Sequence, residues 1–145
     1  MYGRVEIVNL NSTLAEPNSV DAVVTFRNLH NWLGSEMDSI FRNTFMALKP
    51  GGSFGVVEHS AKFGTDLETM KSSGYVTEDY AIEVALEHGF ELVAKSEINA
   101  NPKDTKDHPK GVWTLPPRLR LDDVDRDKYE SIGESDRMTL LFRKP

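Results

Sequence analysis

Apolar residues follow two spacings along the chain, and these spacings predict an alternation of strands and helices. Residues 5–10 alternate apolar and polar side chains and are rich in branched residues, which favours a strand. Residues 21–26 form a short continuous apolar run, which is typical of a parallel strand covered on both faces. Further strands are predicted for residues 53–59, 90–98 and 137–145.

Two helices are predicted between these strands. The first begins at Ser35 and carries apolar residues at helical spacing on one face. These residues are Met37, Ile40, Phe41, Phe45 and Leu48. The sequence Lys-Pro-Gly-Gly at 49–52 ends this helix, because proline lacks a backbone donor and glycine permits a positive φ. The second helix spans about residues 78–88, between a Thr77 cap and Gly89.

This order of elements predicts one α/β domain over residues 1–145, in which parallel strands are joined by right-handed crossovers. Residues 99–136 are rich in proline and charge and lack periodicity, so we expect a long, lid-like excursion there. Ligands in such sheets bind beyond the carboxyl ends of the strands. That rule points to residues 11–13, 27–32 and 58–62.

Composition narrows the possible functions. The formal net charge is -6 and no long basic run occurs, which disfavours a nucleic-acid partner. The chain has no cysteine, so a disulfide framework and a cysteine-based zinc site are both excluded. No apolar segment is long enough to predict a membrane span.

Titratable residues stand at two of the predicted strand ends. His30 could act as a general base, because the pKa of an imidazole lies near neutrality, or it could only cap the next turn. Glu58 and His59 could orient a substrate hydroxyl, and Glu58 could equally be a polar strand end in solvent. Two histidines and a carboxylate are the minimum for a metal site. Their spacing matches no recognised motif, so we assign no metal ligand.

The long excursion contributes three candidate substrate residues. Trp113 could pack on a substrate, while Arg118 or Arg120 could meet an anionic group. The alternative is a surface flap whose tryptophan fills a small separate apolar cluster. The sequence favours neither interpretation.

Several segments together resemble the C-terminal part of a class I S-adenosylmethionine-dependent methyltransferase. They occur in the family's order: NSVDAVVTFRNLHNW, FMALKPGGSFGVVEHSA, IEVALEHGFELVAKS and GESDRMTLLFRKP. Bacterial predicted methyltransferases also carry a stretch like WTLPP at 113–117. The resemblance implies a partial Rossmann-like sheet, mostly parallel with an antiparallel C-terminal strand and helices on both faces. It also implies a transferase that acts on a small-molecule acceptor, with S-adenosylmethionine as cofactor.

The family's cofactor residues have partial counterparts here. The resemblance makes residues 5–10 the third strand, followed by Asn11 and Ser12 near the adenine. It places Arg27 and Asn28 against the methionine part of the cofactor, with Trp32 among the substrate residues.

The family's glycine-rich loop after the first strand is missing, since no Gly-x-Gly occurs anywhere in the sequence. We therefore expect a truncated domain that binds the cofactor weakly or not at all and is inactive by itself.

Loss of the family's first strand would leave residues 21–26 at the edge of the sheet. Such an apolar edge invites pairing with another chain, so we expect a homodimer across it or an exchange of residues 5–10. A non-catalytic oligomerising or partner-binding module is the alternative function. A dehydrogenase-like enzyme is a weaker one, since its glycine fingerprint is missing too. We expect a cytoplasmic protein, although a preceding segment could have carried a secretion signal.

Overall fold

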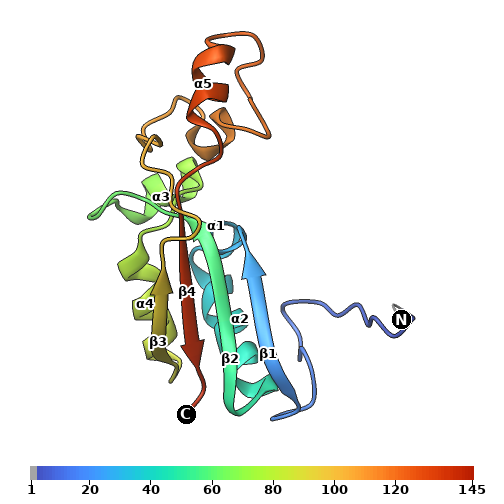
Figure 1. Ribbon diagram of the computed structural model, residues 1–145. Coiled ribbons are helices and arrows are strands. Elements are labelled where there is room, and N and C mark those ends of the chain that lie inside the picture. The colour runs from blue at the N-terminus through green and yellow to red at the C-terminus, as the bar shows by residue number, and fades with distance from the viewer. Residues whose placement is uncertain (1–2) are drawn as a thin grey trace.

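The computed structural model describes residues 3–145 as a four-stranded sheet with helices and a long irregular extension at one end (Figure 1). The elements in chain order are β1 (Val20–Phe26), α1 (Leu29–Trp32), α2 (Ser35–Ala47), β2 (Leu48–His59), α3 (Leu67–Ser73), α4 (Glu78–Glu87), β3 (Glu91–Ser96), the 3-10 helix η1 (Gly111–Thr114), α5 (Arg126–Ile132) and β4 (Arg137–Arg143).

The sheet has the order β1-β2-β4-β3. Strand β1 pairs with β2 in parallel, and β4 runs antiparallel to both of its neighbours, β2 and β3. Three strands therefore share one direction and the C-terminal strand opposes them, as the sequence predicts. Within residues 3–145, β1 is an edge strand with Val24 and Phe26 exposed, which confirms the predicted edge.

The main core lies between the sheet and helices α2 and α4, which contact each other on one face. Aromatic rings dominate it: Phe54 of β2 meets Phe41 of α2 edge-on with ring centroids 5.3 Å apart, and Phe90 and Phe142 lie beside it. Burial of each such ring contributes about 2 kcal/mol. On the opposite face Val24 of β1 and Leu141 of β4 are exposed, so within residues 3–145 the core helices cover one face of the sheet, not the two faces predicted.

Local signals set the helix ends largely as predicted. The Thr77 side chain accepts a hydrogen bond from the Tyr80 N–H at the start of α4. Helix α2 begins at Ser35, but the capping position is Gly34 and no side chain caps it. The helix ends at Ala47 and β2 begins at once at Leu48, before the predicted strand start at residue 53. Residues 49–52, with Gly51 at a φ of 81°, form an irregular stretch in β2 where its register with β1 shifts.

The prediction of a strand at residues 5–10 is wrong. These residues have no regular secondary structure, and Ile7 is 97% exposed. Alternating side chains favour a strand only where a neighbouring strand can satisfy the backbone, and within residues 3–145 none lies beside this segment.

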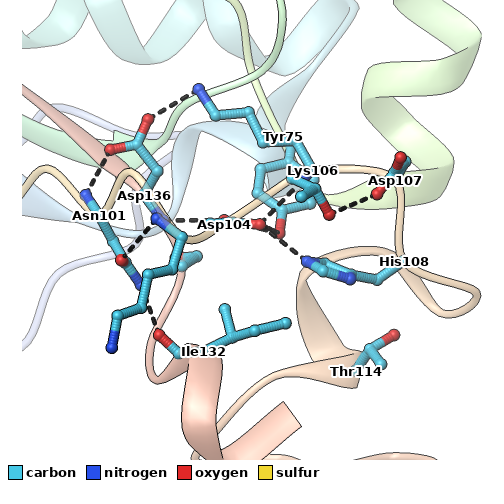
Figure 2. A network of polar contacts seen from close by, with 12 residues as sticks. Tyr75, Asn101, Asp104, Lys106, Asp107, His108, Thr114, Ile132 and Asp136 are labelled. Atoms are coloured by element: carbon cyan, nitrogen blue, oxygen red, sulfur yellow. Dashed lines mark hydrogen bonds and ion pairs between the residues drawn. The ribbon is translucent and has the colours of Figure 1, made fainter. Parts of the chain in front are cut away.

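Residues 97–136 form the extension beyond the carboxyl ends of β1, β2 and β3 (Figure 1). A fully buried carboxylate, that of Asp104, holds this extension to the body (Figure 2). It accepts hydrogen bonds from the Tyr75 hydroxyl at 2.9 Å, His108 Nε2 at 2.8 Å, and the backbone N–H groups of Lys106 and Asp136. The irregular segment is therefore anchored by a polar centre, beside a small apolar cluster of Ala61, Tyr75 and Val112.

None of the helices in the described part of the chain is long and apolar enough to cross a membrane.

Candidate functional site

The candidate site lies where the parallel strands β1 and β2 end side by side. Strand β1 ends at Phe26, and Arg27 adopts a left-handed backbone with a φ of 56°. This strained residue turns the chain into α1, which carries His30. Because β2 ends at Glu58 and His59 on the same edge, the structure brings together the three titratable residues named from the sequence.

Glu58 is the centre of this group and is fully buried. Its carboxylate accepts hydrogen bonds from the backbone N–H groups of His30 at 3.2 Å and His59 at 2.7 Å. His30 Nδ1 lies 3.1 Å from Oε1 of the same carboxylate. The alternative of a solvent-facing strand end is therefore wrong for Glu58, whose side chain orients both histidines.

His59 is held on its other side by Ser135, whose Oγ lies 2.5 Å from Nδ1. Burial, together with the charges of His30, Arg137 and Arg27, lowers the pKa of His59 from its ordinary value to about 4. Glu58 opposes this shift but does not overcome it. His59 is therefore neutral at physiological pH.

A cavity of about 320 Å³ opens in front of the two histidines. Thirteen residues line it: Phe26, Arg27, His30, His59, Val112, Trp113, Leu115, Pro116, Pro117, Arg118, Glu134, Ser135 and Arg137. The Trp113 and His30 rings meet edge-on with centroids 5.9 Å apart. Trp113 also packs against a small separate apolar cluster, so both interpretations weighed for it describe part of its surroundings.

The two arginines predicted in the excursion have different positions. Arg118 lines the cavity, whereas Arg120 lies outside it, with its guanidinium 4.7 Å from the centre of the Trp113 ring. Arg120 therefore supports the ring from outside the cavity.

Sequence reasoning missed Ser135 and Arg137, which also line the cavity. A signal for both was present: an antiparallel strand starts at the edge where its parallel neighbours end, so residues at the start of β4 belong to the same site.

A second groove of about 240 Å³ runs along the exposed edge of β1. Asn28 and Trp32 line it, as does Phe26, which also lines the first cavity. Asn11 and Ser12 lie outside both cavities and are exposed; both form hydrogen bonds to nearby Asn9, and the Ser12 carbonyl accepts one from Asn43. The structure thus separates the four predicted cofactor residues.

Comparison with protein-family models finds no match, and comparison with curated proteins finds none either. Solved structures do match over nearly the whole chain. The cyclase SpnF superposes with a TM-score of 0.65 at 20% identity, over 97% of this chain and 56% of the cyclase. A SAM-dependent methyltransferase from Methanosarcina mazei gives a TM-score of 0.61 at 13% identity, over 96% of this chain and 66% of that protein.

The fold is that of the class I SAM-dependent methyltransferases. A third structure with this fold is geranyl diphosphate C-methyltransferase from Streptomyces coelicolor, solved with Mg²⁺, geranyl diphosphate and S-adenosyl-L-homocysteine. It matches with a TM-score of 0.58 at 10% identity, over 97% of this chain and 52% of the enzyme. The present chain thus spans about half to two thirds of the length of these methyltransferase-fold proteins.

Proposed function

We propose that the chain carries the acceptor-binding part of a SAM-dependent methyltransferase that acts on a small molecule. The observation that carries the proposal is the contact between His30 and the buried Glu58, at a cavity beyond the carboxyl ends of β1 and β2. In open α/β sheets this edge is where ligands bind. The volume of about 320 Å³ is that of a small-molecule site.

The charge of the cavity wall supports an acceptor with an anionic group. Arg27 and Arg118 line the cavity, and neither forms a salt bridge within residues 3–145. The one carboxylate on the wall, Glu134, is paired with Arg137 at 2.6 Å. A carboxylate or phosphate on the acceptor would satisfy the free guanidinium groups.

His30 is the proposed general base. Glu58 already accepts from two backbone N–H groups, so His30 Nδ1 serves as a third donor to it and Nε2 keeps a free lone pair. His30 can then take the acceptor's proton as the acceptor attacks the methyl group in line. His59, with a pKa of about 4, is too weak a base for this role at neutral pH.

We place the cofactor in the groove along β1, next to Asn28 and Trp32. Phe26 lies on the wall of both cavities, so a methyl group could pass from donor to acceptor beside it. Asn11 and Ser12 lie away from this groove, which supports weak cofactor binding by this chain alone.

Titration with S-adenosylhomocysteine tests the proposal, by calorimetry and by NMR of the backbone amides and tryptophan indoles. We expect a dissociation constant weaker than ~0.1 mM, with shifts at Asn28 and Trp32. Absence of any shift up to ~5 mM would contradict a cofactor groove on this chain. A micromolar dissociation constant would contradict the expected weak binding of S-adenosylhomocysteine. It would mean that other residues or a second chain complete the cofactor pocket.

The exposed edge of β1 favours a second candidate function, a non-catalytic module that dimerises through this strand. Val24 and Val124 are both 62% exposed, one on this edge and one in the excursion, so they make a matched pair. In sedimentation equilibrium, Val24→Lys should yield monomers while Val124→Lys leaves a dimer intact. A wild-type chain that is monomeric at ~100 μM would contradict this candidate.

A further inference from the structure

The group formed by His30, Glu58 and His59 has a property that proton transfer does not require. Each residue offers one ligand atom, and these atoms all lie within 4.8 Å of one another. Glu58 Oε1 lies 3.1 Å from His30 Nδ1 and 4.0 Å from His59 Nε2. Ligands at about 2.1 Å from one metal ion are separated by about 3.0–3.5 Å, so a small closure would make the set complete.

The buried charge of Glu58 is the second observation. Its side chain is 0% exposed, and within residues 3–145 its ion-pair partners are the two histidines, not a lysine or arginine. A buried carboxylate is costly unless it is paired with a positive charge, and a bound cation would supply that charge directly.

The surroundings of His59 match those of a metal ligand. Metal-binding imidazoles usually use one nitrogen for the metal and donate the other N–H to a fixed oxygen. Here Ser135 Oγ engages Nδ1, which leaves the Nε2 lone pair facing Glu58. The ring is therefore already fixed in the required orientation by a residue of the excursion.

We infer that His30, Glu58 and His59 form a site for one divalent first-row transition metal ion, of the Zn²⁺ or Fe²⁺ type. Two imidazoles and one carboxylate are a donor set of such ions, whereas Mg²⁺ and Ca²⁺ prefer oxygen ligands throughout. Both histidines line the 320 Å³ cavity and Glu58 lies behind them, so the remaining coordination positions face the cavity. An open position of this kind suits a catalytic ion more than a structural one.

The arginines of the cavity determine which ligand would occupy the open coordination positions of the metal ion. Arg27, Arg118 and Arg137 repel a cation, which limits its affinity, and they favour an anionic oxygen ligand on it. On binding, the ion would displace the Nδ1 proton that His30 donates to Glu58 in the metal-free chain. A hydroxyl bound to the ion would lose its proton more readily, so the ion would replace His30 as the activating group. The inference rests on the geometry of the group and stands without methyl transfer.

Calorimetric titration of the metal-stripped full chain with Zn²⁺, alongside Co²⁺ absorption spectra, tests the site. We expect one equivalent to bind, and His30→Gln and His59→Gln each to weaken binding at least ~100-fold. Ser135→Ala should weaken it roughly tenfold, because it removes only the orienting oxygen. His88→Gln is the matched control: this histidine contacts Val84 and Asp38, away from the cavity, and its loss should leave Zn²⁺ affinity unchanged.

Excess Mg²⁺ should not displace the bound ion. Circular dichroism checks that each variant is folded. If a histidine variant is unfolded, the wild-type chain loaded with Co²⁺ is used in its place. Paramagnetic shifts of the His30 and His59 ring protons then report whether these residues bind the ion. A folded wild-type chain that binds no Zn²⁺ stoichiometrically would overturn the inference, as would binding that survives both substitutions. This titration contains no cofactor, so its failure is separate from failure of the proposed methyltransferase function.

Discussion

Residues 3–19 and residues 97–136 both lack long helices and strands, but the first segment is mostly exposed and the second is anchored to the body of the molecule. Residues 3–19 are mostly exposed, with Leu10 and Leu14 at the groove along β1 and an exposed hydrogen bond from Asn43 to the Ser12 carbonyl. Residues 97–136 carry the short helices η1 and α5 and are otherwise irregular, but the buried Asp104 ties them to Tyr75 on the body. The two segments therefore differ chiefly in burial and in the hydrogen-bond partners of their polar groups.

The difference matters for function, because the anchored segment builds the cavity. Trp113, Arg118 and Ser135 reach the cavity wall only while the excursion is fixed over the strand ends. The N-terminal segment contributes Leu10 and Leu14 to the groove along β1 and none of the residues that line the cavity. The proposed acceptor cavity should therefore be more rigid than the groove along β1.

Removing the anchor should have the largest effect. Asp104→Ala leaves the Tyr75 hydroxyl, the His108 ring and two backbone N–H groups without their buried partner. We expect a loss of about 3–5 kcal/mol in the free energy of unfolding, measured by urea denaturation. Asp123→Ala, an exposed carboxylate in the same segment, is the control and should change it by less than about 0.5 kcal/mol. Equal effects of the two substitutions would contradict the anchoring role.

The close approach of the excursion to α3 gives the next largest effect. Gly111 has a φ of 56°, and an added Cβ would lie 2.1 Å from the Ser73 carbonyl oxygen. Gly111→Ala should therefore cost about 3 kcal/mol in the same assay, from steric overlap and backbone strain together. Gly64, with a φ of 77° and open space around it, is the matched control and should cost about 1 kcal/mol. A mild effect at Gly111 would mean that the excursion is not docked here.

The pH dependence of stability should report how completely the excursion covers His59. The folded pKa of about 4 lies below the ordinary value of 6.5, so the unfolded chain takes up a proton first as pH falls. The stabilisation is complete above about pH 6.5 and declines toward pH 4, with a loss of about 2 kcal/mol near pH 5. Urea unfolding of wild type and His59→Gln should differ by this pH-dependent component. Parallel pH profiles would show that His59 is open to solvent.

Asn43 and Asn101 each bind one of the two segments, so replacing them compares the segments directly, with the smallest expected effects on stability. Asn43→Ala removes the hydrogen bond to the Ser12 carbonyl and should change the free energy of unfolding by at most about 0.5 kcal/mol. Asn101→Ala removes side-chain hydrogen bonds to the carbonyls of Ile132 and Glu134 inside the excursion. It should cost about 1–3 kcal/mol. A larger loss of stability for Asn43→Ala than for Asn101→Ala would contradict the difference between the two segments.

Local patterns predicted the parts of the fold that depend on near neighbours. Helix α4 begins where Thr77 caps it, and α2 ends at Ala47, just before the Lys-Pro-Gly-Gly sequence at 49–52. The strand-end rule brought together His30, Glu58 and His59, because it follows from strand direction alone.

Distant partners account for the failures. Residues 5–10 have the alternation of a strand but no adjacent strand within residues 3–145, and alternation carries no information about neighbours. The anchoring role of Asp104 was also hidden, since its partners Tyr75 and Asp136 lie 29 and 32 residues away in a polar, aperiodic context. The hydrogen bond between Ser135 and His59 spans 76 residues, so the direction of β4, and no local pattern, was the one signal for it.

Native-state hydrogen exchange of the intact chain tests the central claim, that an anchored excursion completes the site over the strand ends. The Lys106 and Asp136 amides, which donate to Asp104, should exchange as slowly as amides of the central strands β2 and β4. The amides of residues 5–10 should exchange at nearly the rate of an unfolded chain. Fast exchange at Lys106 and Asp136 would mean that the cavity does not persist in solution, and the proposed site would fall with it.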